Sequence, residues 1–281
     1  MAESENKKTV QEPSEEEIPV LDESISQYET IKDKPLKYKL EYFWDYYRLP
    51  VALILLFGFI IFSVIRTFVT AKDYALTLVL VNADIMESYE LTDTWEYEIG
   101  QLIGINEKKE KVVVDTSIDI GEHGSETLQY AALQKLVAFF TSQTVDIFVA
   151  DSAFYEQYCQ TRYLADLRDI YSEERLEELS EYIYYTDGAT FSDYDDLSSL
   201  TVTEDQAKYI VDHRDPDSMK EPIPMGFYIP EGSRLGESGM YAYLADSSEY
   251  QGHPAEAIIG IPRNTPRIEN TVKAIDYIMG R

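Results

Sequence analysis

The chain has little cysteine, glycine and proline. Its 281 residues include one cysteine, Cys159, and 24 glycines and prolines together. A single cysteine forms no internal disulfide, which excludes a disulfide scaffold and any zinc site or redox motif built on paired cysteines. We expect Cys159 to be a small buried apolar residue. Because 44% of the residues are hydrophobic, a collagen-like or wholly disordered chain is also excluded.

Basic residues are scarce as well. The sequence holds 24 Lys and Arg against 52 Asp and Glu, a net charge of -28. Proteins that bind nucleic acids neutralise phosphates with Lys and Arg, so the composition excludes a DNA- or RNA-binding function.

Recognisable catalytic and cofactor motifs are missing. The sequence contains no P-loop, GxGxxG or GxSxG pattern. His123, His213 and His253 lie too far apart in sequence to predict a zinc pair. Residues 193–204 approach the register of a calcium loop, but Leu197 and Ser198 occupy positions that need an oxygen ligand and a glycine. We therefore expect no cofactor and no metal, and an enzyme is the weakest of three function classes.

The N-terminal part divides by charge. Residues 1–31 carry nine acidic side chains against two lysines and show no apolar periodicity, which predicts a disordered acidic tail. Residues 32–48 carry five Lys or Arg and end in an aromatic run at positions 42–47. This basic and aromatic composition is typical of a juxtamembrane segment.

An uncharged apolar run follows and predicts a transmembrane helix over residues 49–71. Residues 49–65 contain no charge, and about 20 residues at about 1.5 Å each cross the roughly 30 Å hydrocarbon core. Five Lys or Arg precede the run within 17 residues, while Arg66 and Lys72 are the only ones from there to Lys108. The positive-inside rule therefore predicts a single-pass protein of the cell membrane, with a cytoplasmic N-terminus and residues 72–281 outside.

A cleaved signal peptide is the alternative. Residues 69–71, Val-Thr-Ala, could be a cleavage site, but the apolar run is long and follows 48 residues. Since no cysteine lies near the run, a lipid-anchored lipoprotein is not predicted.

Residues 72–281 alternate strand and helix patterns. Apolar, β-branched runs predict strands at 74–82, 111–119 and 145–150, and periodic segments predict helices at 91–104 and 126–141. This alternation predicts a parallel sheet with right-handed crossovers and helices on both faces. A last helix, from Thr265 or Pro266 to Met279 with Thr265 as its N-cap, is expected to place an apolar stripe on the core. The stripe comprises Ile268, Val272, Ile275 and Met279.

Three segments resemble type II extracytoplasmic solute-binding proteins. They are VDIFVADSAFYEQYCQTRYLADLRDI from Val145, MGFYIPEGS from Met225, and AIIGIPRNTPRIENTVKAIDYIMG from Ala257. The single N-terminal anchor also resembles a group of Gram-positive bacterial membrane proteins. The resemblance implies an α/β fold with a parallel-sheet, solute-binding-like lobe and a second, reduced lobe, because residues 182–221 are polar. It also implies a small solute as ligand and an ABC-type permease as partner.

Polar residues follow the predicted strands. Ligands of open parallel sheets bind beyond the carboxyl ends of the strands. Caps and turns are the alternative role for such residues. Tyr155 and Tyr228 add aromatic faces that suit sugars, peptides or amines. The predicted ligand-binding residues are Asn82, Asp84, Thr116, Ser117, Asp151, Ser152, Tyr155 and Tyr228.

Two functions therefore lead. The first is a membrane-anchored extracytoplasmic solute-binding-like protein that delivers or senses a small solute with an ABC-type transporter. The second is a degenerate binding fold that acts as a membrane-anchored interaction or accessory subunit without ligand. A receptor predicts an open pocket between lobes, whereas an accessory subunit predicts a filled cleft and exposed apolar side chains.

Overall fold

The computed structural model describes residues 34–89, 91–120, 126–191, 211–247, 249–250 and 253–281. The predicted disordered tail, His123 and the calcium-loop-like segment lie outside these residues. The chain divides into two units, residues 1–70 and residues 71–281, and each is described by itself. The helical elements are α2 (Leu36–Thr70), α3 (Ile85–Ser88), α4 (Leu91–Ile103), α5 (Glu126–Thr141), α6 (Ser152–Gln160), η1 (Leu167–Asp169), α7 (Glu173–Glu178), η2 (Ser180–Tyr182), η3 (Gly188–Thr190), η5 (Pro216–Ser218), α8 (Arg234–Glu237), α9 (Leu244–Ser247) and α10 (Ile268–Ile278). The strands are β1 (Asp73–Leu80), β2 (Glu110–Asp115), β3 (Ile147–Asp151), β4 (Ile183–Asp187), β5 (Pro222–Tyr228), β6 (Glu249–Tyr250), β7 (His253–Pro254) and β8 (Ala257–Gly260).

The first unit contains one long helix. α2 runs for 35 residues, and its part Tyr47–Thr70 is long and apolar enough to cross a membrane, with a mean hydropathy of 2.5 and no buried residues. This part coincides with the predicted span at 49–71. Pro50 lies inside α2, where its ring removes one backbone hydrogen bond and favours a bend.

The second unit is built on a six-stranded sheet with the order β2-β1-β3-β8-β5-β4. β1 pairs in parallel with both β2 and β3, as the alternating pattern predicts. The other pairs, β3 with β8, β8 with β5 and β5 with β4, are antiparallel. The fold is therefore mixed α/β, with a parallel half formed by the first three strands and an antiparallel half formed by later ones.

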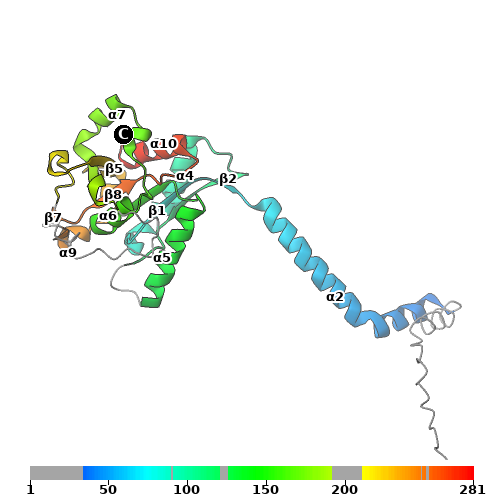
Figure 1. The fold of residues 1–281 in the computed structure, drawn as a ribbon. Coiled ribbons are helices and arrows are strands. Elements are labelled where there is room, and N and C mark those ends of the chain that lie inside the picture. The colour runs from blue at the N-terminus through cyan, green and yellow to red at the C-terminus, as the bar shows by residue number, and fades with distance from the viewer. Residues whose placement is uncertain (1–33, 90, 121–125, 192–210, 248, 251–252) are drawn as a thin grey trace, which may run out of the picture. The chain divides into compact units, whose positions relative to one another are not determined.

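Helices cover both faces of the sheet. On one face α4 and α10 pack over Leu76, Leu78 and Ile259 (Figure 1). On the other face α5 and α6 pack over Val79, Phe148 and other residues of the second core cluster (Figure 1). Strands buried on both faces need continuous apolar runs, which explains the composition of β1 and β3. The three-layer arrangement predicted for residues 72–281 is confirmed.

The C-terminal helix docks as predicted, but its cap differs. Ile275 and Met279 are buried, and Ile268 and Val272 pack against the same core cluster. α10 begins at Ile268 with Arg267 at the N-cap position, so the prediction of Thr265 as N-cap is wrong by two residues. The Thr265 hydroxyl instead donates to the buried Asp146 carboxylate and accepts a hydrogen bond from Arg267 N. Thr265 thus contacts Asp146 ahead of the helix, and Arg267 at the N-cap position has a non-helical backbone.

The second lobe is not a separate unit in the described part of the chain. Residues 71–281 form one compact unit. The polar stretch expected to hold a reduced lobe, residues 182–221, contributes β4, η3 and η5, and residues 192–210 lie outside the described part. β4 and β5 pair with each other and extend the same sheet. Hence the described residues offer no cleft between two lobes.

Candidate functional site

The carboxyl ends of β1, β2 and β3 form the edge where a ligand was expected. β1 lies between β2 and β3, so the chain leaves β1 toward one side and reaches β3 on the other side. In open α/β sheets such a reversal of strand order leaves a crevice at the carboxyl ends of the two strands. Here that point lies between the end of β1, at Val81 and Asn82, and the end of β3, at Asp151.

Asn82 ties the strand ends together. Its Nδ2 lies 3.3 Å from Asp151 Oδ2, and its Oδ1 accepts a hydrogen bond of 2.7 Å from Ile120 N. Its backbone has a positive φ of 58°, in the left-handed region that asparagine tolerates better than most residues. Asn82, just past the end of β1, therefore contacts the end of β3 and the segment that follows β2 through its side chain.

Asp84, Asp151 and Ser152 also make bonds within the chain. Asp84 accepts from Met86 N at 2.8 Å, and Asp151 is the N-cap of α6, accepting from Phe154 N at 3.0 Å. Ser152 is buried, and its N–H donates to the carbonyl oxygen of Glu256 at 2.8 Å. These positions match the role of caps and turns that was the alternative at the sequence level.

Ser117 belongs to a small polar cluster after β2, beside the half-buried Thr116. Its hydroxyl donates to Asp115 Oδ1 at 2.6 Å and accepts from Lys135 Nζ at 2.7 Å, while Lys135 also pairs with Asp115 at 2.8 Å. Partial burial raises the pKa of Asp115, but the hydrogen bonds from Lys135 and Ser117 outweigh it and the pKa is lowered. An ionised Asp115 and a paired lysine do not activate Ser117 as a nucleophile.

Tyr155 is a core residue. Its side chain is fully buried, and its hydroxyl donates to Met225 O at 2.7 Å. The ring lies so close to Gly226 and Gly260 that a Cβ at either position would clash with it. Burial raises the pKa of Tyr155 well above its ordinary value, so the hydroxyl stays protonated. The glycines of β5 and β8 therefore make room for this tyrosine within the sheet layer.

Tyr228 is covered by a cation. The Arg214 guanidinium lies 3.6 Å from the centroid of its ring. Arg214 Nη2 in turn lies 2.9 and 2.8 Å from the two carboxylate oxygens of Glu256. The ring face that was predicted to stack on a ligand is thus occupied by Arg214.

Two tyrosines close the crevice between β1 and β3. The Tyr241 hydroxyl donates to Val81 O, just past the end of β1, at 2.9 Å and lies 3.4 Å from Val149 O within β3. The Tyr243 hydroxyl donates to Asn82 O at 2.8 Å. Burial raises the pKa of both phenols, so both remain donors at neutral pH. The segment Gly239–Tyr243 therefore packs against the end of β1 and against β3.

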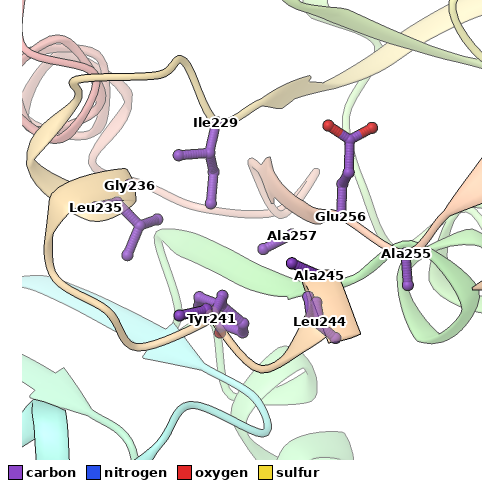
Figure 2. A pocket seen from close by; sticks show the side chains of 10 residues that line it. Ile229, Leu235, Gly236, Tyr241, Leu244, Ala245, Ala255, Glu256 and Ala257 are labelled. Carbon is purple, nitrogen blue, oxygen red and sulfur yellow. The ribbon is translucent and has the colours of Figure 1, made fainter. Parts of the chain in front are cut away.

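A shallow hollow of about 430 Å³ remains beside this segment. Polar and apolar groups contribute almost equally to its wall, and Figure 2 shows the apolar side chains of Ile229, Leu235 and Leu244 around its centre, with the carboxylate of Glu256 pointing away. The complete lining is Ile229, Leu235, Gly236, Tyr241, Ala242, Leu244, Ala245, Ala255, Glu256 and Ala257. The hollow offers an apolar surface and one aromatic ring.

A buried titratable cluster lies on the other face of the sheet, at α6 and β4. Glu156 is buried and accepts hydrogen bonds from Tyr184 Oη at 2.9 Å and Thr186 Oγ1 at 2.7 Å. His213 Nδ1 lies 3.9 Å from Glu156 and its ring stacks on Tyr184. Burial raises the pKa of Glu156. The described residues contain no group of three or more acidic, His or Cys side chains placed to hold a metal.

Sequence reasoning did not single out the residues that close the edge. Tyr241 and Tyr243 stand in an aromatic pair at i and i+2, and the chain's 23 tyrosines hide that signal. Glu156, Arg214 and Glu256 are polar residues in an acidic chain, and their pairing depends on contacts 28 to 42 residues apart. The eight predicted contacts remain predictions, but the structure gives most of them partners inside the chain.

Comparisons with known proteins give limited likeness. No protein-family model and no curated protein matches the chain. Among solved structures, an ABC substrate-binding protein of Listeria monocytogenes in complex with cycloalternan is 12% identical, with 74% of this chain and 75% of that chain covered and a TM-score of 0.31. The PBP AttC of Agrobacterium tumefaciens C58, in an open unliganded conformation, is 11% identical over 73% and 79%, also at 0.31. Likeness at this level carries no argument about function.

Proposed function

We propose that the protein is a membrane-anchored, non-catalytic interaction module of solute-binding-like architecture. In this proposal α2 crosses the cell membrane, residues 1–48 lie in the cytoplasm, and the α/β domain lies outside. The domain acts as an accessory subunit that contacts a membrane partner, such as an ABC-type permease, and holds no polar solute at its strand ends.

The observation that carries this proposal is the closure of the strand-end crevice. Tyr241 donates to the carbonyl of Val81 and Tyr243 to the carbonyl of Asn82, while the carbonyl of Val149 accepts from Val81 N, so these backbone groups at the strand ends are already bonded. A solute that displaced the two hydroxyls would have to replace their hydrogen bonds, because a buried carbonyl left unpaired costs about 1–3 kcal/mol. The described part of residues 71–281 also forms one compact unit, whereas a hinged receptor closes two lobes around its ligand.

Exposed apolar side chains next to the closed edge support a contact with a partner. Met86 and Tyr89 lie two and five residues after Asp84 and are 85% and 80% exposed. These two side chains give the edge an apolar surface that a protein partner would remove from water.

Photo-crosslinking in native membranes tests the proposal. A benzoylphenylalanine at Met86 is expected to yield one discrete adduct with a membrane protein, and the same probe at the exposed Glu269 of α10 is expected to yield none. Equal labelling from both positions, or from neither, would count against the interaction function.

A second candidate, a receptor for a small solute, is favoured by the hollow. Its volume of about 430 Å³ falls in the range of small-molecule sites, and its apolar lining suits a hydrophobic group. In this version the protein delivers or senses an apolar solute together with an ABC-type transporter.

A thermal-shift screen of the full chain in nanodiscs separates the two candidates. A ligand at 100 times its dissociation constant stabilises by about 2.7 kcal/mol. The interaction function predicts no shift with sugars, amino acids, peptides, amines or apolar solutes. A shift that Ala257→Trp removes would establish the receptor, because the indole would fill the hollow.

A further inference from the structure

The N-terminal part of α2 carries two separate stripes. Residues three or four apart share one face of a helix. Leu36, Leu40, Phe43 and Tyr47 follow this spacing and form an apolar stripe. Lys37, Glu41, Asp45 and Arg48 form a charged stripe on a different face. This part of α2 is therefore amphipathic, unlike the uniformly apolar span that follows.

The apolar stripe is strongly exposed. Leu36 is 84% exposed, Leu40 is 73% exposed, and Trp44 at the border of the stripe is 64% exposed. Phe43 stacks on Tyr47 along the same stripe, with ring centroids 5.3 Å apart. A face of this kind needs an apolar partner that excludes water.

Pro50 separates this part from the span. Proline inside a helix removes a hydrogen bond and bends the helix. Figure 1 shows that the N-terminal end of α2 turns away from the direction of the span. Hence the amphipathic part can lie at an angle to the span, along the membrane surface.

We propose that residues 36–47 form a surface helix that lies in the cytoplasmic headgroup layer and binds anionic lipid headgroups through Lys34 and Lys37. This inference rests on the proposed membrane anchoring and goes beyond it. The apolar stripe is continuous with a span that already lies in hydrocarbon, so the same bilayer is within its reach. Amphipathic helices with aromatic residues on the apolar face sink about 5–10 Å into the boundary of headgroups and acyl chains.

Charge complementarity selects the anionic lipid. Lys34 lies two residues before α2, Lys37 and Lys39 lie in its first turn, and Arg48 lies next to the span. These four basic residues outnumber the two acidic ones of the segment, Glu41 and Asp45. Basic residues near the membrane surface are attracted by anionic headgroups, and their long side chains reach the headgroups while the helix lies flat. Residues 1–31 are acidic, so anionic headgroups repel them. Lys34 and Lys37 therefore mark the point in the sequence where attraction to the membrane surface begins.

A single tryptophan reporter tests the orientation. The chain has two tryptophans, Trp44 and Trp95, so Leu36→Trp with Trp44→Phe and Trp95→Phe gives one reporter at the far end of the stripe. The full chain is reconstituted into phosphatidylcholine vesicles with or without phosphatidylglycerol, each carrying a shallow or a deep spin-labelled lipid. If α2 ran straight, residue 36 would stand about 16 Å beyond Tyr47, at about 1.5 Å per residue, and would escape quenching.

We expect the shallow label to quench the reporter more than the deep label, and phosphatidylglycerol to increase this quenching. Lys34→Gln with Lys37→Gln should remove the effect of phosphatidylglycerol. The matched control, Lys108→Gln with Lys109→Gln in the outer domain, changes the net charge equally and should leave the effect intact.

Each of the other possible results contradicts one part of the proposal: the surface helix, the recognition of anionic headgroups or the membrane anchoring. An unquenched reporter in vesicles that float with the protein excludes the surface helix and leaves the anchor standing. Equal quenching with and without phosphatidylglycerol excludes headgroup recognition. Protein that does not float with the vesicles contradicts the membrane anchoring itself.

Discussion

A buried carboxylate, Asp146, joins three segments of the α/β domain. It accepts a hydrogen bond of 2.8 Å from Thr77 N in β1 and another from the Thr265 hydroxyl. It also forms an ion pair with Arg267, whose Nε lies 2.8 Å away. Arg267 also donates to the carbonyls of Gln143 and Thr144. The carboxylate is removed from water and depends on Arg267 for its charge balance.

Removing this arginine should therefore destabilise the domain. We expect Arg267→Met to lower the free energy of unfolding by about 3 kcal/mol, because breaking a buried pair leaves an uncompensated charge. Lys273→Met breaks an exposed i,i+4 pair with Glu269 on the same helix and should cost less than about 0.5 kcal/mol. Urea denaturation measures both. If both variants lose the same free energy of unfolding, the buried ion pair contributes no more to stability than the exposed one.

Glu156 gives a pH dependence of stability. Its raised pKa means that the folded state holds the proton more tightly than the unfolded state, whose ordinary value is 4.5. Stability from this group is full below that value and is lost as the pH rises through the folded pKa. We expect Glu156→Gln, which keeps the group neutral, to reduce the fall in melting temperature between pH 5 and pH 8. An unchanged slope would assign the pH dependence to other groups.

At the residue scale, the sequence showed which positions are polar but not which partners they have. Asn82, Asp151 and Ser152 were predicted to line the strand ends, and they do lie there. Their partners, including Glu256 more than a hundred residues later, depend on where β8 enters the sheet. No local pattern carries that information.

At the scale of elements, α10 is the clearest test of docking. Its N-terminal register was misjudged because the bond between Thr265 and Asp146 has no local signature. Its apolar stripe was predicted correctly, because burial of one face sets a 3.6-residue period.

Ile275→Asp should unfold the domain. Ile275 is 1% exposed, so an aspartate there would be a buried and unpaired charge, and we expect a loss of more than about 4 kcal/mol. Glu269→Asp on the exposed side of the same helix is the control. Circular dichroism melts compare the two. If Ile275→Asp melts like the control, α10 is not docked on the sheet.

Strands β1, β2 and β3 agree with the predicted ranges to within a few residues. Their apolar runs are continuous because both faces of a central sheet are covered. β4 was missed because residues 183–187 include polar and aromatic residues typical of an edge strand, with no alternating helix before β5. The antiparallel half has no counterpart to the strand–helix alternation that identifies parallel crossovers.

For the whole molecule, the sidedness of the membrane is the first property to establish. We expect Ser180→Cys, at an exposed position, to react with an impermeant maleimide on intact cells, and Ser14→Cys to react only after lysis. The native Cys159 is fully buried and should add no background. The reverse pattern of labelling would contradict the predicted orientation.

The link between α2 and the α/β domain is short. α2 ends at Thr70 and β1 begins at Asp73, so two residues join the helix to a strand that is paired on both sides. Any mechanical load that passes along the chain from α2 enters the domain through β1. Because ladder hydrogen bonds run across the strands, such a pull must shear the ladders with β2 and β3 together and cannot open them one bond at a time. A partner that pulls the domain away from α2 would therefore apply the force first to β1, a strand that is hydrogen-bonded on both sides.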